Sequence, residues 1–287
     1  MKKIQLKIIN FFFRFFSKLL HISGKRKHEL QKLRYFTEFE ERKDDIYIAT
    51  FLKSGTTWTQ MIVYLLFNDK VPDFDHIYDV SPWLSNEAFL GKSAERVNQL
   101  PSPRFFKSHD KHDKYSPEME GKVIYVYRNV EDLVVSLLHH ERAYKRSDIQ
   151  LEEIIDKHFS VKKGNSWFKF HGDWLRNENG LSIHYIRYED WKNNFDTTLQ
   201  SLANFLNINL TAEKMEFVKK YSSFEYMKEH ETKFGEQPKR EDERVFNQFI
   251  RKGEVGEGNK ELTIEQQHVL KRDYEILVKP LEIEVKK

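Results

Sequence analysis

One glycine in the first third of the chain lies among residues suited to bind an anion. The loop reads Lys53, Ser54, Gly55, Thr56, Thr57 and Trp58. β-Branched and aromatic residues precede it and an apolar segment with helical spacing follows it, which predicts a strand, a tight turn and a helix. The unpaired amides and the dipole at such a helix N-terminus favour phosphate-like groups. The alternative is a helix start capped by Ser54 or Thr56, with Lys53 in solvent.

The position of Lys53 argues against an ordinary ATPase or GTPase. A Walker A loop carries its lysine directly after its second glycine, whereas Lys53 lies two residues before the only glycine of this loop. At the end of a strand, the ammonium group would reach the bridging oxygen of a nucleotide's leaving group. Thr56 and Thr57 add hydroxyl donors, and Trp58 is placed to stack on a base.

A histidine follows the second strand-like segment, residues 104–107. This segment ends in Lys107, Ser108 and His109, so it brings His109 to the sheet edge that carries the loop around Gly55. A neutral imidazole with a pKa of about 6.5 suits the removal of a proton from a hydroxyl. Because the chain contains 12 histidines, an ordinary hydrogen-bonded surface histidine is the alternative.

An arginine follows the third strand-like segment. Asn129 and Asp132 have the spacing of a capping box, so Arg128 is expected at a strand end beside a helix start, with Ser136 two turns along that helix. Arg128 and Ser136 together predict a second anion site. The alternative is that Arg128 only bridges to a carboxylate.

Four short segments have strand-like patterns, and helical patterns separate them. They span residues 46–51, 104–107, 123–127 and 182–187, after a charged connector over residues 25–45. The alternation predicts an α/β fold: a P-loop-like, three-layer domain with a central parallel sheet flanked by helices and sites at the carboxyl ends of the strands. We expect a single domain over residues 29–287, with a surface loop or lid over residues 229–258.

Composition limits the partners. Residues 1–28 hold eight lysines and arginines and no acid, a charge of +8, whereas the remaining residues hold 40 basic and 45 acidic side chains, a charge of −5. This balance excludes a broad nucleic-acid surface on the globular part, so we expect no nucleic-acid partner. The chain has no cysteine, which excludes disulfides and thiolate sites and fits a reducing, cytoplasmic location.

The basic N-terminal segment is also apolar. Its polar residues Lys7, Asn10, Arg14 and Lys18 fall on one narrow helical face. Arg14 and Lys18 interrupt the apolar run before it reaches the ~20 residues that span a bilayer, and no small-residue cleavage site follows. We expect a basic amphipathic helix over residues 1–28, bound to an anionic membrane surface through residues 1–24. The alternative is a helix packed on the domain's own core or on a second subunit.

Together these motifs resemble the cytosolic-type sulfotransferase family. Its members move a sulfuryl group from 3′-phosphoadenosine 5′-phosphosulfate (PAPS) to a hydroxyl or amine and release adenosine 3′,5′-bisphosphate (PAP). The resemblance covers about residues 44–275. Its most specific segments are KSGTTW (53–58), RFFKSH (104–109), YRNVEDLVVS (127–136), SWFKFHGDW with IRYED (166–190) and RKGEVG (251–256). It implies a PAPS-dependent sulfotransferase that needs no metal.

The resemblance also implies a role for each matching residue. The residues implied to hold PAPS are Lys53, Ser54, Gly55, Thr56, Thr57, Trp58, Arg128, Ser136, Tyr188, Ser222, Phe224, Arg251, Lys252 and Gly253. Lys53 is implied to stabilise the leaving phosphate, and His109 to act as the catalytic base with Lys107 as an auxiliary cation. Arg128, Ser136 and the loop over residues 251–253 are implied to grip the 3′-phosphate.

The acceptor side is less defined. By the resemblance, Trp83, Phe89 and His140 line an acceptor pocket, although Trp83 also suits an ordinary core position. An apolar, partly aromatic lining predicts a hydrophobic alcohol or phenol, and the N-terminal helix favours a lipid-like acceptor. We expect loose, in-line transfer, in which the protein mainly positions the reactants and neutralises charge on the leaving oxygen. His109 then takes the acceptor's proton.

Two features depart from the family pattern. Glu257, Gly258 and Asn259 replace the family's Asp-Trp-Lys, which predicts a more flexible lid. Only Thr263 and Ile264 match the dimer motif of many animal members, so the oligomeric state stays open. Two other functions also stay open: a membrane-associated nucleotide-binding protein without transferase activity, and a small-molecule kinase that transfers phosphate with Mg²⁺.

Overall fold

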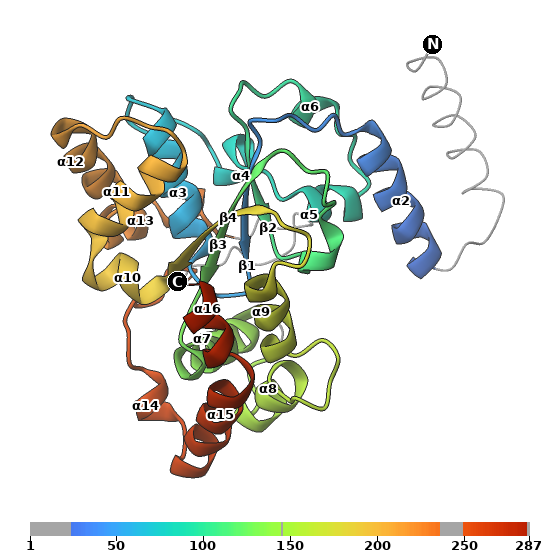
Figure 1. Cartoon of the computed structure of the whole chain (residues 1–287), viewed down its shortest axis with the longest axis vertical. Helices are drawn as coiled ribbons and strands as arrows, with labels where there is room; N and C mark the ends of the chain where they lie inside the picture. The colour runs from blue at the N-terminus through green and yellow to red at the C-terminus, as the bar shows by residue number, and fades with distance from the viewer. Residues whose placement is uncertain (1–23, 145, 236–248, 286–287) are drawn as a thin grey trace.

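The computed structural model describes residues 24–144, 146–235 and 249–285. Its central sheet has four parallel strands in the order β2, β1, β3, β4. The strands are β1 (Ile46–Thr50), β2 (Phe105–Ser108), β3 (Lys122–Tyr127) and β4 (Ser182–Arg187). Figure 1 shows the sheet between two groups of helices. The predicted parallel α/β fold is confirmed, and each strand begins and ends within one residue of its expected segment.

Side chains alternate between the two faces of the sheet, and each face has its own apolar core. Ile48 and Ile124 pack on one face, whereas Tyr47 and Tyr125 pack on the other. Because both faces are buried, the strands carry almost no polar side chains outside their ends. This explains why short apolar runs, rather than alternating ones, mark the strands in the sequence.

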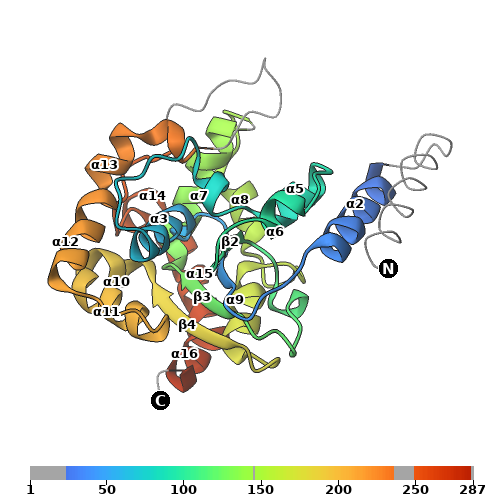
Figure 2. The ribbon, with the colours of Figure 1, turned by 90° about the horizontal axis from the view of Figure 1, so that it is seen from above.

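Helices cover both faces and complete three layers, as the view in Figure 2 shows. The helices on the face of Ile48 are α3 (Thr56–Phe67), α10 (Tyr188–Asn193), α11 (Phe195–Phe205), α12 (Ala212–Tyr221) and α13 (Phe224–Glu229). Those on the face of Tyr125 are α7 (Val130–Tyr144), α8 (Leu151–His158), α9 (Trp167–Arg176), α15 (Ile264–Leu277) and α16 (Lys279–Val285). Shorter elements lie in the connections: α4 (Ile77–Val80), α5 (Leu84–Phe89), α6 (Glu95–Asn98), η1 (His112–Lys114), η2 (Glu231–Lys233) and α14 (Gly258–Glu261).

The segment expected as a charged connector is largely helical. α2 (Gly24–Glu38) covers most of residues 25–45 and lies beside α5 in both ribbon views. Tyr35 is fully buried, and its hydroxyl donates to the Glu87 carboxylate of α5 at 3.2 Å. Burial of this aromatic side chain therefore orders the helix against the domain. Of the amphipathic helix expected over residues 1–28, residues 1–23 lie outside the described residues.

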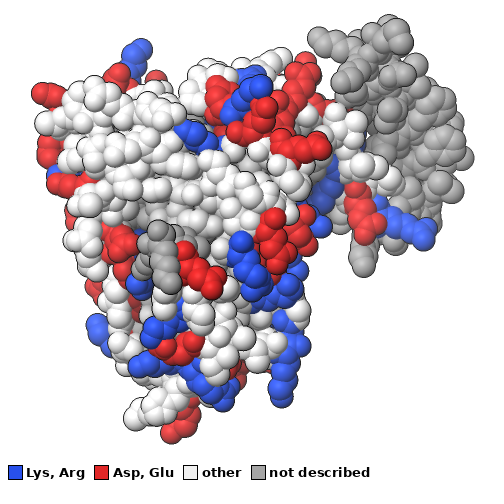
Figure 3. Space-filling view, viewed as in Figure 1, with Lys and Arg blue, Asp and Glu red and all other residues white. Residues whose placement is uncertain are grey.

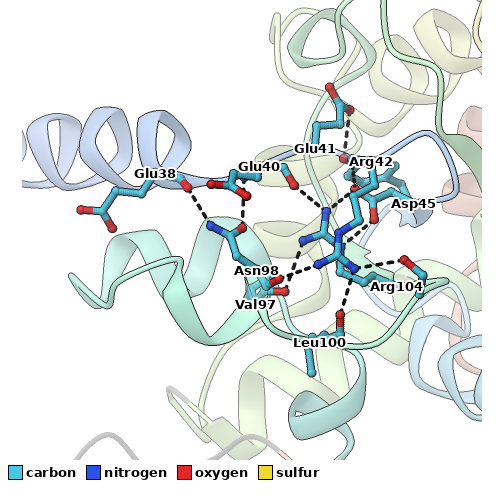
Figure 4. Close-up of polar contacts among 11 residues, drawn as sticks. Glu38, Glu40, Glu41, Arg42, Asp45, Val97, Asn98, Leu100 and Arg104 are labelled. Atoms are coloured by element: carbon cyan, nitrogen blue, oxygen red, sulfur yellow. Dashed lines mark hydrogen bonds and ion pairs between the residues drawn. The ribbon is translucent and has the colours of Figure 1, made fainter. Parts of the chain in front are cut away.

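A buried ion pair joins the starts of β1 and β2. The Arg104 guanidinium donates to both carboxylate oxygens of Asp45, at 2.8 and 2.6 Å, and neither side chain is exposed. It also donates to the carbonyl oxygens of Glu40 at 2.7 Å and Val97 at 3.2 Å, as Figure 4 shows. The ion pair is bidentate, and further N–H groups of Arg104 donate to carbonyl oxygens. Each charge therefore has partners, whereas either charge buried alone would be costly.

The surface mixes both signs of charge. On the face drawn in Figure 3, lysine and arginine are interspersed with aspartate and glutamate. Across the described ranges, no helix is both long and apolar enough to cross a bilayer. Among those same residues, no group of three His, Asp or Glu side chains is placed to hold a metal ion.

Candidate active site

A cavity of about 290 Å³ lies where β1, β2 and β3 end. It brings together most of the residues that the sequence indicated. Those in its lining are Lys53, Gly55, Thr56, Thr57, Trp58, Trp83, Lys107, His109, Arg128, Ser136, His140, Tyr188, Ser222, Phe224, Arg251, Lys252 and Gly253. Ser54 and Phe89 do not line it.

The turn between β1 and α3 has the shape of an anion-binding loop. Lys53 (φ 64°) and Gly55 (φ 96°) both adopt the left-handed conformation. A Cβ atom at Gly55 would lie 2.7 Å from Cδ2 of Tyr188, so a larger residue would displace that ring. Gly55 is the N-cap of α3, and within the part of the chain that the structure describes no side chain caps this helix. The alternative of a cap by Ser54 or Thr56 is therefore wrong, and the first amides of α3 have no side-chain acceptor.

The hydroxyls of this loop have different surroundings. The Oγ1 atom of Thr56 lies 2.6 Å from that of Thr50, which ties the loop to β1. Thr57 is half-buried in the cavity lining. Ser54 is fully buried, and its Oγ atom has no hydrogen-bond partner among the described residues. Both residues expected as hydroxyl donors, Thr56 and Thr57, thus line the cavity, whereas Ser54 does not.

His109 is held in an orientation that suits a general base. Its Nδ1 atom lies 2.9 Å from the carbonyl oxygen and 3.1 Å from the hydroxyl of Thr50. The tautomer that donates from Nδ1 to the carbonyl leaves Nε2 with a free electron pair. Burial, followed by the nearby Lys107 cation, lowers the pKa of His109 to about 3, and the hydrogen bond to Thr50 only partly opposes this shift. The imidazole is therefore neutral at physiological pH, and it is not an ordinary surface histidine.

Lys107 lies beside this base in an aromatic setting. Its Nζ atom donates to the Tyr78 hydroxyl at 2.7 Å and lies 4.4 Å from the centre of the Trp83 ring. The Lys107 amide donates to the carbonyl oxygen of Pro82 at 3.0 Å, so the Trp83 segment continues the sheet beyond β2. The Trp83 ring also meets His109 edge to face, with centroids 5.1 Å apart. Trp83 is thus a cavity residue rather than part of the central core.

Arg128 joins the cavity to the late loop, residues 251–258. Its Nη2 atom donates to the carbonyl oxygen of Glu254 at 2.8 Å, and its guanidinium lies 4.5 Å from the centre of the Tyr188 ring. Asp132 is 3.8 Å away, so the carboxylate bridge is long. The buried Nε atom has no acceptor among the described residues, which leaves Arg128 with capacity to bind an anion. Ser136 lines the same cavity from α7.

The late loop is fastened to the start of α7. The Asp132 amide donates to Asn129 Oδ1 at 3.1 Å, as a capping box requires. The Asp132 carboxylate, however, accepts the amides of Gly256 and Gly258 at 2.8 Å each. Only one of the two hydrogen bonds of the expected capping box forms, because the Asp132 carboxylate accepts amides of the late loop instead.

Glu257 forms ion pairs with other residues of the late loop. Its carboxylate pairs with the Arg251 guanidinium and with Lys252 Nζ at 2.9 Å. At Gly253, where φ is 63°, a Cβ atom would lie 3.0 Å from Cδ2 of Phe224. Contacts that hold this loop against the cavity are therefore present without the family's Asp-Trp-Lys.

The family follows from comparison with known proteins. The family model described as "Sulfotransferase domain" matches residues 43–282. The chain belongs to this sulfotransferase family. The enzyme is 30% identical over 265 residues to sulfotransferase 1E1 of Bos taurus, covering 87% of this chain and 88% of that protein. It is 29% identical over 249 residues to the amine sulfotransferase of Oryctolagus cuniculus, covering 83% and 82% of the two chains.

A solved structure has a similar fold. Retinol dehydratase, in complex with androsterone and inactive cofactor PAP, matches this sulfotransferase with a TM-score of 0.71 and 18% sequence identity. The match covers 88% of this chain and 86% of that one. The predicted sulfotransferase fold and enzyme class are confirmed.

In this sulfotransferase, aromatic rings gather around Trp58. Trp58 Nε1 donates to the carbonyl oxygen of Ser222 at 2.8 Å, and its ring stacks on Phe195 with centroids 6.2 Å apart. The Nζ atom of Lys192 lies 5.7 Å from the centre of the Trp58 ring. Lys192 lines the cavity, although no sequence motif singled it out.

The structure places one expected acceptor residue elsewhere. Phe89 lies at the end of α5, is 41% exposed and stacks on His28 of α2 with centroids 4.1 Å apart. Trp83 immediately precedes α5, and a helix rises 1.5 Å per residue, so Phe89 ends up well beyond the cavity wall. Its contact with α2 is not predictable from the sequence, because the charged composition of residues 25–45 indicates a connector.

Proposed function

We propose that this sulfotransferase transfers the sulfuryl group of PAPS to a hydroxyl, or an amine, of a hydrophobic small-molecule acceptor. The observation that carries this proposal is the orientation of His109. Thr50 holds its Nδ1 atom, and the ring lines one cavity together with Lys53 and the uncapped start of α3. A neutral base and an anion-binding loop in one cavity are what in-line transfer from an anionic donor requires.

The donor half runs from the loop around Gly55 to the late loop. The amides of α3 and Lys53 bind the 5′-phosphosulfate, and Lys53 neutralises the charge that grows on the leaving phosphate. Arg128, Ser136 and Arg251 bind the 3′-phosphate. The unpartnered Nε atom of Arg128 supports this assignment, as does the PAP bound to a protein of similar fold. The adenine stacks against the rings that gather around Trp58.

The acceptor half lies around Trp83. His109 Nε2 accepts the proton of the acceptor's hydroxyl as its oxygen bonds to sulfur, and Lys107 stabilises the charge shared between the entering oxygen and the sulfuryl group. Leu52, Trp83 and Phe249 are apolar residues of the cavity lining, which favours a hydrophobic alcohol or phenol. His140 adds a polar group to the cavity lining, and we assign it to the acceptor half.

Membrane binding through the N-terminus belongs to this proposal. We assign residues 1–28 to a basic membrane-surface helix and residues 29–287 to the enzyme domain, on the cytoplasmic side of the membrane. Two apolar side chains of α2, Leu33 (66% exposed) and Phe36 (44% exposed), point to solvent three residues apart. Exposed Arg26, Lys27 and Lys32 accompany them. Apolar and basic residues in one segment suit an anionic lipid surface and a lipid-like acceptor.

A transfer assay tests the proposal. The purified enzyme is incubated with radiolabelled PAPS and a panel of steroid alcohols, phenols, aliphatic amines and polar sugars, and the products are identified by mass spectrometry. We expect a gain of one sulfate group on hydrophobic alcohols or phenols, with PAP as the second product. Binding of PAP without transfer to any acceptor would favour a binding protein. Transfer of phosphate from ATP with Mg²⁺ would favour a kinase.

A further inference from the structure

A carboxylate forms ion pairs with two cations of the proposed 3′-phosphate pocket. Glu257 lines the cavity and is only 5% exposed. Its carboxylate pairs with Arg251 and, at 2.9 Å, with Lys252. Burial alone would raise the pKa of Glu257, but the hydrogen bonds from Arg251 and Lys252 lower it below its usual value. The side chain is therefore charged.

The other nearby carboxylate has a different task. Asp132 accepts two amides of the late loop and lies 3.8 Å from Arg128. Removing the Asp132 charge would release the loop. The Glu257 carboxylate, in contrast, accepts from the Arg251 and Lys252 cations and from no backbone amide among the described residues. Glu257 is thus the carboxylate that can leave while Asp132 keeps the loop in place.

A bound 3′-phosphate would meet Glu257 at close range. The phosphate is dianionic near neutral pH, and the cradle of Arg128, Arg251 and Lys252 holds three positive charges. Glu257 already neutralises part of this charge, and two anions that share one pair of cations repel each other. Phosphate and carboxylate therefore compete for Arg251 and Lys252.

We propose that Glu257 is the internal counter-anion of the 3′-phosphate pocket. It holds Arg251 and Lys252 when no nucleotide is bound and yields them to the phosphate when the donor enters. The inference rests on the proposed function, because it takes Arg251 and Lys252 as the phosphate ligands. The exchange lowers the affinity for any 3′-phosphorylated nucleotide by the fraction of time that Glu257 holds the cations. It therefore weakens binding of the product PAP as well as of the donor.

Calorimetric titration of the full chain with PAP and with adenosine 5′-monophosphate (5′-AMP) tests this inference. For Glu257→Gln we expect the dissociation constant of PAP to fall about tenfold, as it would if the pocket were free only about one tenth of the time. The constant for 5′-AMP, which lacks the 3′-phosphate, should stay within about twofold. Glu265→Gln removes an exposed carboxylate at the start of α15 and should change neither constant.

Each outcome decides between distinct explanations. Equal or weaker PAP binding by Glu257→Gln, with 5′-AMP binding retained, would overturn the inference and make Glu257 a structural clamp. A wild-type enzyme that does not bind PAP would instead contradict the proposed donor site. If Glu257→Gln does not fold, Glu257→Asp keeps the charge but shortens the side chain by one methylene. It should tighten PAP binding severalfold, and unchanged binding would again overturn the inference.

Discussion

The Nδ1 atom of His109 lies 2.9 Å from the carbonyl oxygen of Thr50, the last residue of β1. The hydroxyl of the same threonine lies 2.6 Å from that of Thr56 in the first turn of α3. One residue therefore sets the orientation of the proposed base and ties down the loop that we propose to bind the leaving group. Thr50 thus couples the two halves of the cavity, and their roles are tested separately by substitutions at His109 and at Gly55.

Replacing the base should abolish turnover and spare nucleotide binding. We expect His109→Ala to lower kcat by about 10²- to 10⁴-fold, the usual contribution of a general base, with the dissociation constant of PAP unchanged within about threefold. Transfer assays and titration with PAP measure the two effects. His140→Ala, which removes a second cavity imidazole, serves as the control and should retain kcat within about tenfold. Full activity of His109→Ala would refute its assignment as the base.

The dependence of kcat on pH should show no inflection near pH 6.5, the pKa of an ordinary histidine. Because burial and Lys107 lower the pKa of His109 to about 3, its imidazole remains neutral and able to accept a proton down to mildly acidic pH. We expect kcat to vary less than about threefold between pH 7.5 and 5.5, whereas a base with a pKa of about 6.5 would lose about tenfold. An inflection near pH 6.5 that disappears in His109→Ala would contradict this.

The same shift predicts how stability depends on pH. The unfolded chain binds a proton at His109 below a pKa of about 6.5, but the folded chain does so only near pH 3. The stability contributed by the neutral ring is therefore complete above pH 6.5 and declines as the pH falls toward 3. His76, His171 and His184 also have lowered pKa values and add to this decline. Urea unfolding at pH 7 and 5 should show a smaller decline for His109→Gln than for the wild type.

Gly55 and Gly180 allow a matched test of the anion-binding loop. Both have positive φ, so alanine costs about 1–2 kcal/mol of strain at either site. At Gly55 the added Cβ would collide with Tyr188, whereas at Gly180 no atom of the described residues lies within 4 Å of it. We expect Gly55→Ala to lose PAP binding by more than about tenfold and Gly180→Ala to retain it. Similar PAP affinity in the two variants would show that the conformation of the turn at Gly55 is not needed to bind PAP.

The buried pair of Arg104 and Asp45 should dominate the stability of the β1–β2 edge. Arg104→Met leaves a buried carboxylate without its partner, so we expect a loss of about 3–5 kcal/mol in the free energy of unfolding. The control Lys43→Met removes an exposed ion pair with Glu120 and should cause no measurable change. Urea denaturation measures both. A loss in Arg104→Met no larger than in the control would mean that the pair contributes little.

Co-sedimentation with phosphatidylserine-containing vesicles tests membrane binding. Deletion of residues 1–24 should remove most of the bound fraction, and Leu33→Ser with Phe36→Ser should reduce it further than Ile276→Ser with Leu277→Ser. The latter pair is also exposed, but it lies on α15. Salt should weaken binding, because part of it is electrostatic. Undiminished binding after the deletion would exclude this role of the N-terminus.

The sequence predicted the sheet and most of the cavity because both depend on local patterns. Apolar strand runs and their polar ends were sufficient to bring Lys53, His109 and Arg128 to one edge of the sheet. Contacts between distant segments were not predictable: Tyr78 meets Lys107 only after the chain has folded across β2. α2 was missed as a helix because its charged composition conceals the single buried ring of Tyr35. Glu257 was visible only as a departure from the family pattern.

The strand order places the two halves of the cavity under different constraints. β2, which carries Lys107 and leads to His109, is an edge strand, and the Trp83 segment continues beyond it. β1, which carries the donor loop, is an interior strand fixed on both sides. Insertions or substitutions around Trp83 can therefore reshape the proposed acceptor side without shifting β1 and β3, which carry the proposed donor side. Under the proposed function, a change of acceptor then requires no change in the part of the sheet that binds the donor.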